Sequence, residues 1–311
     1  MSQIETMPES HNPYADGIAY ADGDYMPVAE ARIPILDWGF LHSDVTYDVV
    51  AVWGGGFFRL SDHLDRFYRG IEKLHMQSPY DRDETASILT ECVRRTGLRE
   101  AYVKVILTRG TPPPGTRDPR ACENRFYALA IPYIWIASPE KQEQGLHLTI
   151  SSIPRIAPES VDPTVKNFHW GDMVQGLFEA YDRGAETPVL TDGAGNITEG
   201  PGFNLFASID GRLITPASGV LLGITRMTVI ELAQSLNVKV DVGTLTEAEL
   251  RQADEIFISS TAGGVMPVTQ LDSKPIGNGH KGILTSRIQA LYWSKRAEGW
   301  HGTKVEDVLN G

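Results

Sequence analysis

A single lysine stands out in the stretch DPTVKNFHWGDM, which runs from Asp162 to Met173. No acidic residue lies within three positions of Lys166 on either side, and its nearest neighbours are mostly apolar or aromatic. Most loop lysines are solvated surface residues, which is one interpretation of Lys166. In an apolar site, by contrast, desolvation lowers the pKa of a lysine, and its neutral amine attacks carbonyl carbons. This second interpretation predicts a nucleophilic amine.

A carboxylate follows the lysine in the stretch TEGPGFNLF, which begins at Thr198. Glu199 precedes two glycines and an apolar strand-like run. A solvated turn before a strand would have this pattern. A glutamate that points into a cleft would have it too, and such a carboxylate could bind a protonated ring nitrogen.

Two further segments have the composition of anion sites. In LLGITR, Ile224 and Thr225 open an expected helix, with Thr225 at the expected N-cap, and helix N-termini bind anions through free N–H groups. In SSTAGG, which includes Ser260 and Thr261, hydroxyls and glycine N–H groups follow an expected strand. Either segment could instead be an ordinary cap or turn. Arg59, at the end of GGGFFR, offers a guanidinium to a phosphate or lies on the surface.

Taken together, these groups fit one small ligand. The lysine suits an aldehyde, the glutamate suits a ring nitrogen, and the two anion segments with the arginine suit a phosphate. Pyridoxal 5′-phosphate (PLP) carries all three groups. We therefore predict PLP as the cofactor, and we predict no metal ion.

The elements that would position these groups mix strands and helices without strict alternation. Amphipathic periodicity predicts helices over Ser61–Met76 and over Arg82–Thr96, the second ended by Gly97. A later helix, DMVQGLFEAYDRG, has an apolar face that we expect to point inward. The pattern predicts an α+β fold rather than a doubly wound parallel sheet. The polar segment 137–145 is the expected linker between domains at 1–136 and 146–311.

Composition limits the function further. The chain has 311 residues and a net charge of −12, which disfavours binding to nucleic acid. Its two cysteines form no CxxC pair, so neither a zinc site nor a disulfide framework is expected. The N-terminal residues lack the features of a signal peptide, and no apolar run is long enough to span a bilayer. We expect a cytoplasmic protein.

In their order along the chain, DPTVKNFHWGDM, TEGPGFNLF, GITR and STAGG resemble the class IV (fold type IV) PLP-dependent aminotransferases. The resemblance covers nearly the whole chain. It implies a small N-terminal α/β domain, a larger C-terminal domain with a β-barrel-like sheet, and a homodimer whose partner completes the active site. It also implies ping-pong transamination, with Lys166 as the Schiff-base lysine and Glu199 paired with the pyridine nitrogen. The phosphate-binding residues implied by the resemblance are Arg59, Ile224, Thr225, Ser260 and Thr261.

The N-terminal stretch LDWGFLHSDVTYDV, together with Trp170 after the lysine, resembles the (R)-selective amine transaminases within this class. That subgroup implies transfer of an amino group from a primary (R)-amine to a keto acid such as pyruvate. His42, Tyr47 and Trp170 would then line the substrate pocket. Arg117, in the loop TPPPGTRDP, is the expected partner of the substrate carboxylate, followed by Arg109, Arg120 or an arginine of the partner subunit. The family often has a tyrosine near the cofactor's phenolic oxygen, where this chain offers Trp170.

Three alternatives remain open. The chain could be a branched-chain or D-amino acid aminotransferase, although the 36–49 stretch argues against the branched-chain enzymes. It could be a PLP lyase, as aminodeoxychorismate lyase is. It could also be a binding protein without catalytic activity, in which Lys166 is only structural.

Overall fold

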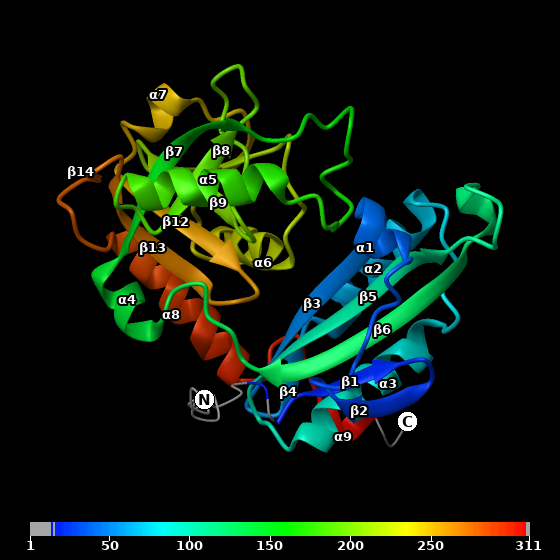
Figure 1. Ribbon diagram of the computed structural model, residues 1–311. Coiled ribbons are helices and arrows are strands. Elements are labelled where there is room, and N and C mark those ends of the chain that lie inside the picture. Colours follow the sequence, from blue (N-terminus) through cyan, green and yellow to red (C-terminus); the bar gives the residue numbers. More distant parts are fainter. Residues whose placement is uncertain (1–13, 15, 309–311) are drawn as a thin grey trace, which may run out of the picture.

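The computed structural model describes residue 14 and residues 16–308. The N-terminal residues on which the signal-peptide prediction rests lie mostly outside this range. The described chain forms two β-sheets and the helices that pack on them (Figure 1). The α+β class predicted from the sequence is confirmed.

The first sheet has seven strands, and every strand pair in it is antiparallel. The strand order is β15-β4-β3-β5-β6-β1-β2. The bounds are β1 Ile18–Ala21, β2 Asp24–Pro27, β3 Val45–Trp53, β4 Gly56–Phe58, β5 Ala101–Thr111, β6 Glu123–Pro132 and β15 Gly302–Lys304. Its helices are α1 Trp38–His42, α2 Leu60–Lys73, α3 Arg82–Thr96 and α9 Val305–Val308, and a 3-10 turn, η1, covers Pro119–Ala121.

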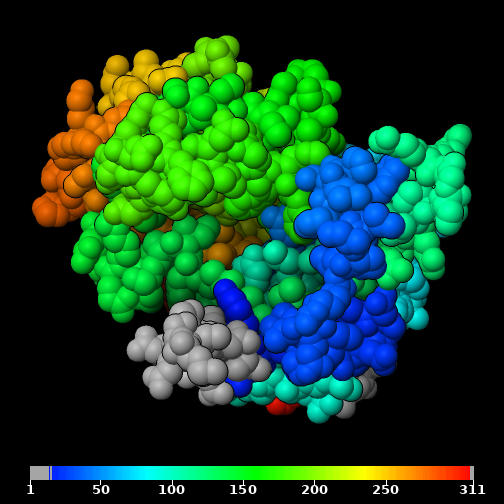
Figure 2. Space-filling view, viewed as in Figure 1, coloured from blue at the N-terminus to red at the C-terminus, as the bar shows by residue number. Residues whose placement is uncertain are grey.

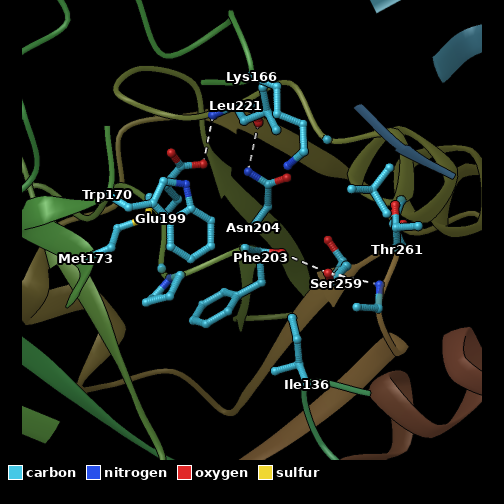
Figure 3. A pocket seen from close by; sticks show the side chains of 18 of the residues that line it. Ile136, Lys166, Trp170, Met173, Glu199, Phe203, Asn204, Leu221, Ser259 and Thr261 are labelled. Atoms are coloured by element: carbon cyan, nitrogen blue, oxygen red, sulfur yellow. Dashed lines mark hydrogen bonds between the residues drawn. The ribbon is translucent and has the colours of Figure 1, made fainter. Parts of the chain in front are cut away.

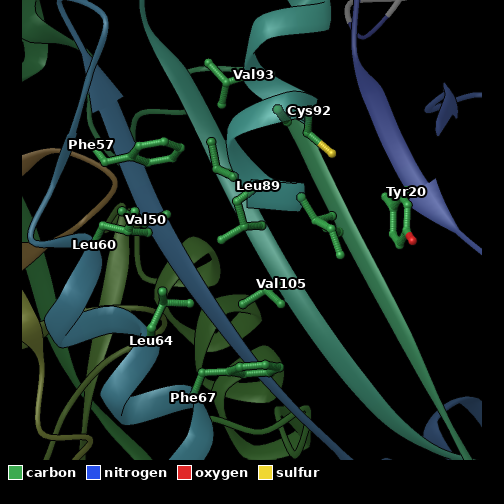
Figure 4. Packing of buried hydrophobic residues seen from close by; sticks show 14 of the residues in the cluster. Tyr20, Val50, Phe57, Leu60, Leu64, Phe67, Leu89, Cys92, Val93 and Val105 are labelled. Atoms are coloured by element: carbon green, nitrogen blue, oxygen red, sulfur yellow. The ribbon is translucent and has the colours of Figure 1, made fainter. Parts of the chain in front are cut away.

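Helices α2 and α3 cover one face of this sheet, and the two faces have different roles. Alternate residues of β3 and β5, such as Val50 and Val105, pack against Leu64 and Phe67 of α2 and Leu89 of α3 (Figure 4). The opposite face carries Tyr47, Val49 and Tyr102. These aromatic and apolar side chains face the second half of the molecule, where the candidate site lies.

The second sheet is mixed and has eight strands in the order β11-β10-β9-β12-β13-β7-β8, and β14 pairs with β13. The bounds are β7 Leu146–Pro154, β8 Thr187–Thr191, β9 Asn204–Ile209, β10 Arg212–Pro216, β11 Val240–Gly243, β12 Glu255–Ser260, β13 Gly264–Leu271 and β14 Lys274–Pro275. Its helices are α4 Pro139–Gln144, α5 Gly171–Asp182, α6 Ile224–Ser235, α7 Glu247–Leu250 and α8 Ile283–Ala297. Apolar clusters pack on both faces of this sheet, and one of them includes residues of α6 and α8.

Two features depart from the predicted division of the chain. The expected linker 137–145 contains helix α4, whose Gln142 is buried and donates a hydrogen bond to the carbonyl of Ala137 at 3.0 Å. Near the other end of the chain, β15 pairs with β4, so the first sheet takes a strand from residues that we placed in the second domain. The polar composition of residues 137–145 led us to predict a loop. A six-residue helix has too few turns to show the periodicity that would have identified it.

Helix α5 shows a second difference. Its expected inward face is largely outward, because Val174, Phe178 and Tyr181 are exposed whereas Met173 and Ala180 are buried. The pattern identified an apolar face correctly, but the described residues of this chain do not cover it. Among the described residues, no helix combines the length and apolar character that crossing a membrane requires.

Candidate active site

A cavity of about 410 Å³ lies between the two sheets. Its wall combines β3 and β5 of the first sheet with three other parts of the chain. These are the lysine segment (162–173), the glutamate turn (198–203) and the start of α6. On the face shown in Figure 2, a hollow opens between these two parts of the molecule. Figure 3 shows Lys166, Glu199 and Thr261 reaching this cavity from three different segments. The fold therefore brings together residues that are far apart in the sequence.

The backbone of Lys166 is fixed to the first sheet. Its carbonyl oxygen accepts hydrogen bonds from the Tyr47 N–H at 3.0 Å and from the Thr46 hydroxyl at 3.2 Å. Lys73 of α2 also holds this loop, because its amine binds the carboxylate of Asp162 at 2.7 Å. These contacts fix the backbone at this point, and the lysine side chain lines the cavity.

The Lys166 amine is in a desolvating environment. Burial, and next the positive charge of Arg66, lower the pKa of Lys166 to about 8, against the opposing charges of Asp48 and Glu199. The Nζ atom lies 4.6 Å from the centroid of the Tyr47 ring. A substantial fraction of this amine is therefore neutral near physiological pH, as a nucleophile or proton carrier requires.

Glu199 is buried at the cavity wall, and the protein fixes both of its oxygens. One oxygen accepts the Leu221 backbone N–H at 2.8 Å, and the other faces the Nε of Arg155 at 3.3 Å. Burial raises the pKa of Glu199, and the Leu221 hydrogen bond and the Arg155 charge oppose that rise. A cationic N–H placed in the cavity would add a third partner for this carboxylate.

Arg155 belongs to a buried charge chain that the sequence did not reveal. Besides facing Glu199, its guanidinium donates to Asp172 at 2.7 Å. Asp172 also accepts the backbone N–H groups of Ile156 and Met173, both at 2.8 Å. Arg155 directly follows β7 and Asp172 lies in the first turn of α5, so the chain ties both elements to the glutamate.

Two glycines let the backbone approach closely at this site. A Cβ at Gly200 would lie 2.1 Å from the Phe203 ring and 2.5 Å from the Pro188 carbonyl oxygen. A Cβ at Gly223 would lie 2.1 Å from the Asn204 side-chain oxygen. Glycine at these positions therefore allows the glutamate turn and the start of α6 to converge on the cavity.

The predicted anion segments meet at the cavity as well. Ile224, Thr225, Ser260 and Thr261 all line it. Helix α6 begins at Ile224 with Gly223 as its N-cap, so Thr225 lies in the first turn rather than at the cap, where we expected it. The first N–H groups of a helix have no partner within it, and they are available to an anion. Nearby, the Ser259 hydroxyl is buried without a hydrogen-bond partner among the described residues.

Arg59 does not reach this cavity, and the prediction that it binds the phosphate is therefore wrong for the chain as folded. It precedes α2 with a left-handed backbone φ of 56°, and its guanidinium binds the carboxylates of Asp62 and Glu231. Arg66, two turns further along α2, lines the cavity instead. Helical periodicity does not single it out, because Arg66 lies two positions from Leu64 and therefore off the apolar face, although the folded chain buries it beside His63 and Gly70.

Arg66 is held in place by a buried aspartate. Asp48 of β3 accepts two hydrogen bonds from the guanidinium, at 2.8 and 2.9 Å, and one from the His63 ring at 2.7 Å. Burial alone would raise the pKa of Asp48, but the charges and hydrogen bonds of Arg66 and His63 hold it well below its usual range. The third guanidinium nitrogen donates to the Leu222 carbonyl at 3.1 Å, beside the start of α6.

Of the four expected substrate residues, two line the cavity and two do not. Tyr47 and Trp170 line the cavity. His42 is exposed on α1, where its ring packs on Trp38 at a centroid distance of 4.7 Å. Arg117 is exposed in the loop between β5 and β6, at the end of the sheet away from the second half (Figure 1). Neither His42 nor Arg117 lines the cavity of its own chain.

We expect Arg66→Met to weaken PLP binding by roughly one to two decades, because a charge-assisted bond to phosphate contributes about 1.5–3 kcal/mol. Arg59→Met is the matched control and should leave PLP affinity unchanged. Titration of each apo variant with PLP measures the affinity, and thermal unfolding of the apo forms separates binding from stability. If Arg59→Met bound PLP more weakly than Arg66→Met did, Arg59 would be the phosphate ligand, as predicted from the sequence.

The residues of the cavity fit PLP. A lysine amine, a buried carboxylate and an anion site made by α6, Arg66 and the 259–261 segment surround one space. The unpartnered Ser259 hydroxyl and the first turn of α6 supply donors for a phosphate.

Comparison with known proteins gives the same answer. Residues 46–271 match the family model described as Amino-transferase class IV. A protein of Methanocaldococcus jannaschii is 31% identical over 93% of this chain and 99% of its own length. The D-alanine aminotransferase of Bacillus licheniformis is 28% identical over 86% of this chain and 93% of its own. Among solved structures, a T.th. branched-chain amino acid aminotransferase with pyridoxamine 5′-phosphate has a TM-score of 0.86 at 28% identity and covers 93% of this chain and 98% of its own.

The chain belongs to the class IV aminotransferases. The family and fold type predicted from the motifs are thereby confirmed, and the predicted cofactor agrees with the pyridoxamine phosphate in the related structure. The particular donor is a separate question, because the named relatives are branched-chain and D-alanine aminotransferases rather than amine transaminases.

Proposed function

We propose that this protein is a PLP-dependent aminotransferase that moves an amino group from a primary amine with an apolar substituent to a keto acid. The observation that carries the proposal is the cavity itself, which places Lys166 and Glu199 in one largely apolar wall. When bound, PLP supplies an aldehyde that takes up the amino group and a ring that withdraws electrons from the reacting carbon.

In this proposal, each residue of the chain has a limited role. The Nζ atom of Lys166 would hold the cofactor's aldehyde carbon at rest, and it would then accept the proton from the donor carbon and deliver it to that former aldehyde carbon. The Glu199 carboxylate holds a proton on the ring nitrogen. Arg66 and the first turn of α6 anchor the phosphate, and the wall made by Tyr47, Val49 and Tyr102 excludes water and contacts an apolar substituent.

Within this activity we propose an (R)-amine as donor and pyruvate as acceptor. The resemblance of the 36–49 stretch and of Trp170 to the (R)-selective amine transaminases supports this choice.

A branched-chain or D-amino acid donor is the second candidate, and the names of the relatives favour it. Single-turnover absorbance spectra of the PLP-loaded protein separate the two. We expect (R)-1-phenylethylamine to convert the cofactor faster than its (S)-isomer, L-leucine or D-alanine does. Faster conversion by L-leucine or D-alanine would overturn the (R)-amine proposal, and pyruvate release without amino transfer to an added keto acid would indicate a lyase.

We also propose a homodimer. Apolar residues are exposed around α1, such as Ile35, Leu36 and Phe40, and on α5, such as Phe178. Exposed apolar surface of this kind commonly marks an interface between proteins. We propose that the partner subunit completes the active site, and light scattering in solution measures whether two chains associate.

A further inference from the structure

A second lysine lies on the cavity side of the first sheet with no carboxylate beside it. Lys104 is in β5, and within the part of the chain that the structure describes, its amine has neither an ion pair nor a hydrogen bond. Its contacts are three aromatic rings, whose centroids lie 5.1 Å (Tyr47), 5.9 Å (Tyr102) and 5.9 Å (Phe168) from Nζ. A half-buried lysine without an anion is unusual, since partial desolvation disfavours its charge.

Lys104 is not itself one of the residues that line the cavity, but the sheet register places it next to several that do. Side chains two residues apart on a strand share a face, so Lys104 lies beside Tyr102. Its cross-strand partner in β3 is Val49. Tyr102 and Val49 both line the cavity, and so does Tyr47, whose ring both Lys104 and Lys166 approach.

The charge state of Lys104 reflects the same surroundings. Burial, and next the charge of Lys166, lower the pKa of Lys104 to about 8. An anion placed between the two amines would offset both effects. The other cations of the cavity wall already have roles, because Arg66 is assigned to the cofactor phosphate, Lys166 to the cofactor aldehyde, and Arg155 is paired with Asp172 and Glu199.

We propose that Lys104 binds the carboxylate of the keto acid acceptor, and of any amino acid donor, in the cavity of its own chain. This inference rests on the proposed aminotransferase function. It explains how one pocket accepts both an apolar group and a carboxylate. With an apolar group bound, the ammonium stays on the aromatic rings, where cation–π contacts partly compensate its charge. With a carboxylate bound, the flexible four-carbon stem lets it reach the anion.

The test compares the binding of two unreactive probes, propionate and propionamide, to the PLP-loaded protein by calorimetry. Lys104→Met should raise the Kd of propionate roughly tenfold to a hundredfold, as the loss of a charge-assisted bond predicts, and leave the Kd of propionamide unchanged. Lys104→Arg should retain most of the propionate affinity. Lys274→Met, at an exposed lysine of β14, is the matched control and should bind both probes as the unaltered protein does.

Two results would overturn the proposal. One is a propionate Kd in Lys104→Met within twofold of the unaltered protein. The other is equal weakening of propionate and propionamide, which would indicate general damage to the pocket. Lys104→Gln provides a second neutral variant if the methionine variant does not fold. Because neither probe reacts, the titration gives an answer even if the proposed donor is wrong, so failure of this inference and failure of the proposed function are distinguishable.

Discussion

Lys166→Ala is expected to reduce amino transfer by at least roughly 10³-fold, because it removes the amine that binds the cofactor and also the group that moves the proton. The fold should persist, since the Lys166 contacts that hold the loop use its backbone carbonyl, which alanine retains. Single-turnover rates with (R)-1-phenylethylamine and circular dichroism of the same preparation measure the two effects.

The matched control is Lys73→Ala. Lys73 fastens the same loop to α2 through Asp162 and Thr164, but its amine does not line the cavity. It should keep turnover within about tenfold of the unaltered protein, as expected for an exposed ion pair. Turnover in Lys166→Ala that matches this control would refute the role of the amine.

Glu199→Gln should slow turnover by roughly 10²–10³-fold, the usual cost of removing one electrostatic stabiliser from an active site. The glutamate accepts the Leu221 N–H with one oxygen and faces Arg155 with the other. A glutamine has one oxygen, so its amide nitrogen must face either a donor N–H or the ring nitrogen. It also lacks the charge that keeps a ring nitrogen protonated.

PLP affinity should change little in this variant, because the phosphate site is separate from the glutamate. The matched control is Glu72→Gln on the exposed face of α2, which should leave the rate unaltered. Rates at saturating PLP, with the affinity measured in parallel, separate chemistry from binding. Full activity in Glu199→Gln would show that the carboxylate has another purpose.

Local signals in the sequence were sufficient to predict some elements of the fold. Helix α3 spans Arg82–Thr96, as predicted, because its capping box at Asp81 and Glu84 and its C-cap at Gly97 are all within the segment. Lys166 and Glu199 were predicted from their motifs and from the resemblance of those motifs to the class IV aminotransferases. Both side chains line the cavity, and their roles stay predictions.

Contacts between distant segments could not be predicted in this way. The choice between Arg59 and Arg66 depends on where α2 begins, and the left-handed turn at Arg59 directs its side chain toward Glu231 of α6. The Arg155 chain joins residues of β7, α5 and the glutamate turn, which only the folded chain brings together. The outward face of α5 shows the same limit, because periodicity identifies an apolar face but not its partner.

We propose that Lys166, rather than Lys104, forms the covalent bond to PLP. Both amines have a pKa of about 8 and approach the same Tyr47 ring. Neither property therefore decides which of the two lysines reacts with the cofactor. Borohydride reduction of the PLP-loaded protein makes that bond permanent, and mass spectrometry of its peptides locates it. We predict the phosphopyridoxyl mass on Lys166 in nearly all molecules. Its presence on Lys104, or on several surface lysines in place of Lys166, would show that Lys166 is not the lysine that binds the cofactor.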